Sequence, residues 1–301
     1  MSSAPDIPAD IRPVLVVGQI RSGTKWLSNL LCNHPLIAGV QSERTLGIIE
    51  TNMFDRMQTK FDLRSADDYV GFIELWRHTE FVRCSGVDVS FLYGLDPRPR
   101  TFVRIFDDTM RLVARERGAS HWLQKCGPAS AERLLRELDG PRLVLIMRDE
   151  LSIARSIRNM SRNRDQHFSI LKALPQIVYT QRQIRALARH EGAVLVSYDE
   201  LKRDTGSALQ RVCSQLGVDY DPSMLKVSYG PNTSFPAGEA GGRKASASGL
   251  EKLIVKALHM LPMPVLRQIL KLRKKKSLPR PLVPGTFSSL KAPLADRRDY
   301  Y

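Results

Sequence analysis

The stretch Val14-Leu-Val-Val-Gly18-Gln-Ile-Arg21-Ser-Gly-Thr24-Lys-Trp26-Leu27 decides the fold of this chain. Four consecutive apolar residues end in a glycine, which is typical of a buried parallel strand. A short loop with Arg21 and small residues follows, and then Trp26, Leu27, Leu30 and Leu31 share one side of a helical pattern. A strand, a small-residue loop and a helix in this order aim several backbone N–H groups at one point. We therefore expect this loop to hold a phosphate or sulfate group.

The same alternation of apolar runs and helical patterns continues along the chain. We expect further strands at 36–40, 121–125, 142–147 and 193–198, and helices at 107–118, 129–138, 151–162, 173–190 and 205–216. This order predicts a three-layer α/β domain with a central parallel sheet and helices on both faces. Ligands of such sheets bind beyond the carboxyl ends of the strands, so we expect Arg21, Lys125 and Arg148 around one crevice.

The chain divides into three segments by composition. Residues 1–227 form the expected α/β core, and 228–249 are rich in Ser, Gly, Asn, Pro and Ala, which predicts a loop or flap. Residues 250–301 are expected to form a helical extension and an extended tail packed on the same domain. The basic amphipathic stretch 250–276 has two interpretations. It docks on the domain and closes the site, which we favour, or it makes peripheral contact with an anionic membrane surface.

The net charge of the chain limits the classes of binding partner that we expect. Its 301 residues are 43% hydrophobic, as in globular proteins, but the formal net charge is +15. Nucleic acid, an anionic membrane and small polyanionic ligands are the three partner classes that such a charge favours.

Cysteine usage and the N-terminal residues bear on the compartment. The four cysteines, Cys32, Cys84, Cys126 and Cys213, form no CxxC pair, which argues against a zinc site and a disulfide scaffold. No basic and apolar leader begins the sequence and no run of about 18 apolar residues occurs in it. We therefore expect free thiols and a cytoplasmic location.

The first loop departs from the Walker A pattern. Gly18 and Gly23 have the separation of that pattern, but Thr24-Lys25 follows Gly23 where the pattern requires Lys and then Ser or Thr. The lysine for the terminal phosphates and the hydroxyl for Mg²⁺ are both displaced, which argues against a nucleotide-dependent kinase. Arg21 instead offers a forked cation to a tetrahedral anion. The expected fold is thus P-loop-NTPase-like, with a different ligand.

A second motif follows the strand predicted at 142–147. Arg148 comes directly after that strand, and Ser156 lies eight positions further, on the next predicted helix. An arginine at a strand end and a serine on the following helix can converge on one dianion.

Together the two motifs resemble those of the sulfotransferases that use 3′-phosphoadenosine 5′-phosphosulfate (PAPS), of the carbohydrate-acting and bacterial type. The sequence Arg21-Ser-Gly-Thr-Lys-Trp-Leu27 is similar to the family's 5′-phosphosulfate loop, [K/R]-S-G-T-[T/K]-x-L. Arg148 and Ser156 are similar to the family's 3′-phosphate pair, although Glu150 stands where the family usually has proline.

Further stretches extend the resemblance over roughly 12–222. Residues 122–128 resemble the family's W-x-x-K-x-x-P segment, 196–201 its R/S-Y-E-D-L segment, and 209–218 the helix end that follows. Arg243-Lys244-Ala245 is a counterpart of the R-K-G segment, with alanine in place of glycine.

The resemblance implies PAPS as the donor, adenosine 3′,5′-bisphosphate (PAP) as the product, and no metal, because the protein supplies the cations. The residues that it implies for donor binding are Arg21, Ser22, Gly23, Thr24, Lys25, Trp26, Arg148, Ser156, Tyr198 and Arg243. Two of these have structural alternatives, since a tyrosine at the position of Tyr198 more often packs in the core, and Trp26 could belong to an apolar helix face or stack on adenine.

The same resemblance assigns the chemistry. Gly127 stands where the cytosolic members place a histidine base, so we expect Glu43 to act as the base. Glu43 could instead pair with Arg44 or Arg21. Arg21 and Lys125 would stabilise charge on the transferring sulfuryl group. The expected acceptor is a hydroxyl of a saccharide, a glycolipid or another small metabolite.

An alternative from another class is a non-catalytic basic module that binds nucleic acid or phosphate. Such a module lines a groove with cations and interleaved aromatic side chains. Aromatic residues are only 7% of this chain, so we expect no nucleic-acid partner.

Overall fold

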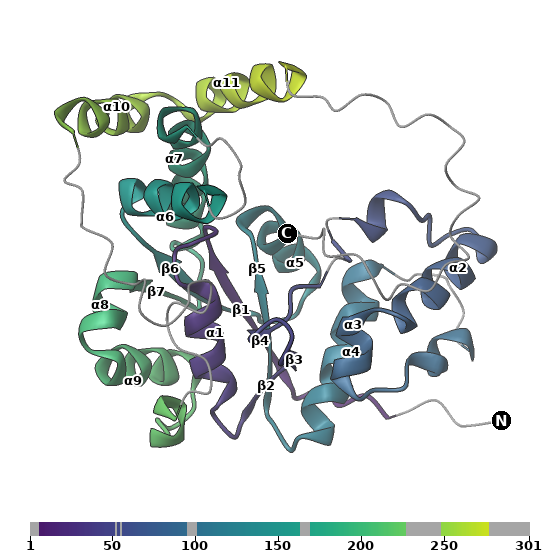
Figure 1. Cartoon of the computed structure of the whole chain (residues 1–301). Helices are drawn as coiled ribbons and strands as arrows, with labels where there is room; N and C mark the ends of the chain where they lie inside the picture. Colours follow the sequence, from purple (N-terminus) through teal and green to yellow (C-terminus); the bar gives the residue numbers. More distant parts are fainter. Residues whose placement is uncertain are drawn as a thin grey trace. The chain divides into compact units, whose positions relative to one another are not determined.

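The computed structural model describes residues 6–51, 53–54, 56–94, 101–162, 169–226 and 248–276. The chain divides into two compact units, Met1–Met260 and Leu261–Tyr301. The first unit is built on a parallel sheet with the strand order β2-β5-β1-β6-β7 (Figure 1). Its strands are β1 (Arg12–Gly18), β2 (Ile37–Gly39), β5 (His121–Cys126), β6 (Arg142–Met147) and β7 (Ala193–Ser197).

The register of the three central strands brings their carboxyl ends together. Val17 of β1 lies beside Cys126 of β5, and Gly18 of β1 lies beside Ile146 of β6. The loop that follows β1 therefore leaves the sheet at the same edge as Lys125 and the residues after β6. This is the arrangement predicted from the three strand ends.

Alternate residues of the strands face two separate hydrophobic cores. Val14 and Val16 pack with α1 (Thr24–Cys32), α8 (Tyr198–Arg203) and α9 (Thr205–Leu216). Leu15 and Val17 pack in the other core, whose residues come mainly from α2 (Ala66–Arg77), α3 (Glu80–Ser85), α4 (Phe102–Glu116), α5 (Pro128–Glu137) and α7 (Ile170–Leu187). Figure 1 shows α8 and α9 on one side of the sheet and α4 on the other. The three-layer P-loop-like α/β fold is thus confirmed.

Several element boundaries differ from those expected. Helix α4 begins at Phe102, five residues before the expected start, because the Thr101 hydroxyl caps it by accepting from the Arg104 N–H. Tyr198, expected as the last residue of a strand, is the first residue of α8. Helix α7 begins at Ile170, after the Ser169 cap, and contains Pro175.

A small hairpin follows β2, in a segment for which the sequence predicted no strands. Strands β3 (Gln41–Ser42) and β4 (Gly47–Ile48) pair in antiparallel fashion. The side chain of Asn29 on α1 holds the hairpin, since its Nδ2 donates to the Leu46 carbonyl (3.2 Å) and its Oδ1 accepts from the Ile48 N–H (2.9 Å). These two bonds attach the hairpin to the helix that follows the phosphate-type loop.

The C-terminal part of the chain contains two described helices. Helix α10 (Gly249–Met260) belongs to the first unit and α11 (Met263–Lys276) to the second. Within the described ranges, no single helix is long and apolar enough to cross a membrane, and only α10 with the first ten residues of α11 meets that criterion as a pair. All four cysteines are free thiols.

Candidate functional site

The loop between β1 and α1 is a tight turn with two left-handed residues. The Ser22 N–H donates to the Gln19 carbonyl (3.0 Å), and the buried Ser22 hydroxyl donates to the same oxygen (2.7 Å). Arg21 has a φ of 69° and Gly23 a φ of 98°. The first intrahelical bond of α1 is donated by the Leu27 N–H to the Gly23 carbonyl (3.0 Å). The N–H groups before Leu27 are therefore those that a helix N-terminus offers to an anion.

Both glycines of this loop are required by close packing. A Cβ on Gly18 would lie 2.5 Å from Thr24 Cγ2 and 2.7 Å from Ile146 Cγ2. A Cβ on Gly23 would lie 2.5 Å from Tyr198 Cδ2. The loop thus approaches the β6 end and α8 closely, and side chains here would push it away.

Arg21 joins the two sequence motifs directly. Its Nε donates to the Ser156 hydroxyl on α6 (Glu150–Arg162) at 2.9 Å, and its carbonyl accepts from Arg148 Nη1 at 3.0 Å. The Arg148 guanidinium in turn lies 4.2 Å from the centre of the Tyr198 ring, and Trp26 meets that ring edge-on at 6.0 Å. The structure therefore brings together five of the side chains that the sequence assigned to the donor.

The electrostatics of this cluster favour an anion. Burial lowers the pKa of Arg21, and the charge of Arg148 lowers it further. Burial likewise lowers the pKa of Lys25, the charges of Lys125 and Arg21 add to that effect, and Glu50 opposes it. Cations that repel one another in a half-buried position are stabilised by a bound anion, because the anion supplies the missing countercharge.

The hairpin and the residues after it contact the two lysines. Lys25 Nζ donates to the Thr45 carbonyl in the hairpin at 2.5 Å. Lys125, at the end of β5, forms an ion pair with Glu50, two residues after β4. Sequence reasoning missed Glu50, because its position beside Lys125 depends on the hairpin, which the sequence did not predict.

Glu43, the expected base, lies exposed in the turn between β3 and β4. Its neighbour Arg44 forms an ion pair with Glu80 of α3. The Ser42 hydroxyl also donates to Glu80, at 2.7 Å. The turn that carries Glu43 is therefore fixed on both sides.

The remaining predicted site residues divide into two groups. Ser22 and Thr24 are buried in the loop and the first turn of α1. Arg243 lies outside the described residues. Among the described His, Cys, Asp and Glu side chains, none form a group of three or more that could hold a metal ion.

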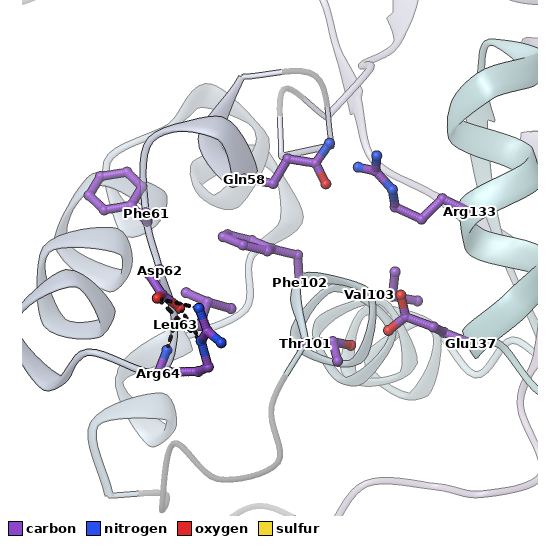
Figure 2. Close-up of a pocket in the computed structure, with 10 residues that line it drawn as sticks. All are labelled: Gln58, Phe61, Asp62, Leu63, Arg64, Thr101, Phe102, Val103, Arg133 and Glu137. Atoms are coloured by element: carbon purple, nitrogen blue, oxygen red, sulfur yellow. Dashed lines mark hydrogen bonds and ion pairs between the residues drawn. The ribbon is translucent and has the colours of Figure 1, made fainter.

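A separate cavity of about 320 Å³ lies between the segment 58–64, the start of α4 and α5 (Figure 2). In Figure 2 the Arg64 and Asp62 side chains are joined by hydrogen bonds, the Arg64 Nε–Asp62 Oδ1 distance being 2.9 Å, and Arg133 and Glu137 project from α5. None of the residues that line this cavity belongs to the cluster of Arg21, Arg148, Ser156, Tyr198 and Trp26.

Comparison with known proteins agrees with the motifs. A family model described as "Sulfotransferase family" matches residues 13–222. Curated protein sequences give no match. Similar solved structures include a sulfotransferase domain from the curacin biosynthetic pathway, with 16% identity, a TM-score of 0.47, and coverage of 89% of this chain and 99% of that one.

Two further solved structures have comparable values. The sulfotransferase domain of the Synechococcus PCC 7002 olefin synthase has 14% identity and a TM-score of 0.48, covering 93% of this chain and 100% of its own. Mouse sulfotransferase SULT7A1, complexed with PAP, has 12% identity and a TM-score of 0.47, covering 88% and 89%. Because these scores are below 0.5, the assignment rests on the family model. That model matches more than half of the chain, including the loop of Arg21 and the strand end of Arg148, and the chain therefore belongs to the sulfotransferase family.

Proposed function

We propose that this protein transfers the sulfuryl group of PAPS to a hydroxyl group of an acceptor and releases PAP. The contact of Arg21 with both Arg148 and Ser156 carries this proposal. A donor with a 5′-phosphosulfate and a 3′-phosphate requires two neighbouring anion sites. The loop with its helix N-terminus and the Arg148–Ser156 pair fit that requirement.

The residues of the cluster then have distinct tasks. Arg21, Lys25 and the N–H groups at the start of α1 would hold the 5′ side of the donor, and Arg148 and Ser156 the 3′-phosphate. Bound PAPS would supply an activated sulfuryl group. Lys125 and Arg21 would neutralise charge on the oxygens around the transferred sulfur. Ser22, Gly23 and Thr24 would shape the loop. Trp26 and Tyr198 would pack against Arg148 or against the adenine of the donor.

A carboxylate would take the acceptor's proton. In the transfer an oxygen–sulfur bond forms with the acceptor hydroxyl, the bond from sulfur to the phosphate oxygen breaks, and the hydroxyl proton goes to the base. Glu43 is the predicted base, and the ion pair of Glu50 with Lys125 makes Glu50 a second candidate. We propose a saccharide, a glycolipid or another small hydroxyl compound as the acceptor, and the cytoplasm as the compartment, which four free thiols support.

Calorimetry with PAP tests the donor site. Arg148→Ala and Ser156→Ala should each weaken PAP binding by about 10- to 100-fold, as loss of hydrogen bonds to a charged group does. Arg189→Ala and Ser214→Ala are matched controls, since Arg189, two residues after α7, and Ser214, on α9, are both exposed. The proposal is wrong if wild type binds PAP no more tightly than the Arg148 and Ser156 variants.

The rate of sulfuryl transfer shows which of the two carboxylates, Glu43 or Glu50, acts as the base. With radiolabelled PAPS and a panel of alkyl glycosides, the base variant should keep its PAP affinity and lose about 10²- to 10⁴-fold in rate. Glu43→Gln is expected to show this loss. If Glu50→Gln shows it instead, the base is Glu50, and if neither does, no base role remains for either carboxylate.

A further inference from the structure

Helix α10 packs along one face against the rest of the first unit, where two of its polar side chains contact residues of α6. Arg155 Nη2 on α6 contacts Glu251 Oε2 at 3.3 Å, and His259 Nε2 contacts Glu150 Oε1 at 2.9 Å. Leu258 is buried on the same side. The side chains of both pairs are less than one-third exposed, so the two contacts fix which face of α10 is turned inward.

The opposite face of α10 carries a stripe of exposed apolar side chains. Leu250, Leu253 and Met260 are 61%, 63% and 78% exposed. At 3.6 residues per turn these positions, with the exposed Ala257, fall within a stripe about 80° wide. Large apolar side chains seldom gather in this way on a surface that only water covers.

The charges beside this stripe are of one sign. Lys252 and Lys256 are exposed and flank the stripe on one side. The single acidic residue of α10, Glu251, is turned inward to Arg155. The outer surface of α10 is therefore apolar and cationic. It complements a surface that has an anionic outer layer over an apolar interior.

We propose that the outer face of α10 binds the surface of an anionic lipid bilayer. The stripe of Leu250, Leu253, Ala257 and Met260 enters the boundary between headgroups and acyl chains, and Lys252 and Lys256 contact the anionic headgroups. The helix lies in the membrane surface and does not cross it, because its 12 residues are too few for a span.

Helix α11, taken by itself, also has two exposed apolar residues on one face, since Val265 and Leu272 lie seven positions apart and about 20° from each other around the helix. Its exposed basic residues Arg267 and Lys271 lie about 100° or more from that pair, so α11 does not repeat the arrangement of α10. The inference is independent of the donor and the transfer reaction.

Vesicle co-sedimentation of the full chain tests the proposal. Wild type should sediment with vesicles of phosphatidylcholine mixed with phosphatidylglycerol, much less with phosphatidylcholine alone, and less as salt rises. The triple change Leu250→Gln/Leu253→Gln/Met260→Gln should weaken binding by more than about tenfold, through loss of buried apolar area. Lys252→Glu/Lys256→Glu should do the same through charge.

Matched variants distinguish binding through the outer face of α10 from nonspecific binding of exposed apolar or basic residues to vesicles. Val70→Gln/Leu75→Gln changes two exposed apolar residues of α2, and Lys60→Glu/Lys172→Glu reverses two exposed lysines elsewhere. Both should sediment as wild type does, and circular dichroism melting should show that every variant is folded. The proposal fails if the α10 variants sediment with vesicles as wild type does, or if wild type binds equally to vesicles with and without phosphatidylglycerol. It also fails if light scattering shows that the stripe instead joins two copies of the chain.

Discussion

The guanidinium of Arg148 lies between the Tyr198 ring, 4.2 Å from the ring centre, and the Arg21 carbonyl, to which it donates at 3.0 Å. Tyr198, the first residue of α8, thereby holds in place an arginine that directly follows β6. Sequence alone left the choice between core packing and a role at the site. The ring is buried, and it also contacts the Arg148 guanidinium.

Replacing Tyr198 tests this contact. Tyr198→Leu should weaken PAP binding by about three- to tenfold, because a cation–π contact of a partly buried arginine contributes about 1 kcal/mol. Tyr198→Phe keeps the ring and should bind PAP as wild type does. Calorimetry gives both affinities. Equal losses in the two variants would mean that the hydroxyl, and not the ring, is what matters.

Gly23 should tolerate no side chain. Gly23→Ala meets both a left-handed backbone and the Tyr198 ring, whereas Gly86→Ala meets only the left-handed backbone, since φ is 77° there and nothing lies within 4 Å. We expect Gly86→Ala to cost about 1 kcal/mol in the free energy of unfolding. Gly23→Ala should cost more and also lose PAP binding. Urea unfolding measures the costs, and equal values would contradict the close packing of the loop on Tyr198.

The Asn29 side chain should determine how firmly the hairpin is held. Asn29→Ala leaves the Leu46 carbonyl and the buried Ile48 N–H without this partner, so the protein should lose about 1–3 kcal/mol in the free energy of unfolding. Asn29→Asp can still accept from the Ile48 N–H but turns a buried carboxylate oxygen toward the Leu46 carbonyl, so it should lose at least as much as Asn29→Ala. Chemical denaturation checks the order. An unchanged Asn29→Ala protein would mean that the hairpin does not depend on this side chain.

Glu80 predicts a dependence of stability on pH. The hydrogen bonds from Arg44 and then from Ser42 lower the pKa of Glu80 below its ordinary value of 4.5. A carboxyl with a lowered folded-state pKa stabilises the protein above its unfolded-state pKa, and this contribution is lost as the pH falls through the folded-state pKa. Glu80→Gln should therefore cost about 1 kcal/mol at neutral pH, a modest value because Arg44 is largely exposed.

Melting curves at several pH values check this expectation. The difference between wild type and Glu80→Gln should shrink as the pH falls below 4.5, and the exposed Glu116→Gln should differ little from wild type throughout. A constant difference at all pH values would show that Glu80 acts through packing and not through its charge.

The central sheet and its cationic edge could be predicted from the sequence, for a physical reason. Parallel strands buried on both faces are continuous apolar runs, so 14–18 and 142–147 stand out, and the residues after them meet at one edge. The start of α4 was also marked in the sequence, because Thr101 is a good helix cap, but the expected helix began later than this signal.

The hairpin and its consequences could not be predicted in this way. Its strands are two residues long, and it depends on Asn29, which lies many positions away, and on Leu46 with a φ of 53°. Glu50 reaches Lys125 only because the hairpin brings it there. Nor does the amphipathic pattern of 250–260 tell which of two apolar faces is turned inward, since that depends on Glu251 and His259 meeting partners on α6.

The two charged contacts of α10 also determine where this protein can be cut. The family match ends at residue 222, yet the first compact unit continues to Met260. A chain shortened to the matched region would remove the Glu251 partner of Arg155 and the His259 partner of Glu150, leaving Glu150 with Arg185, and would expose the surface that α10 covers. Glu150 begins α6 two residues after Arg148, so the change would be next to the proposed donor site. An expression fragment meant to keep the donor site intact should therefore extend through Met260.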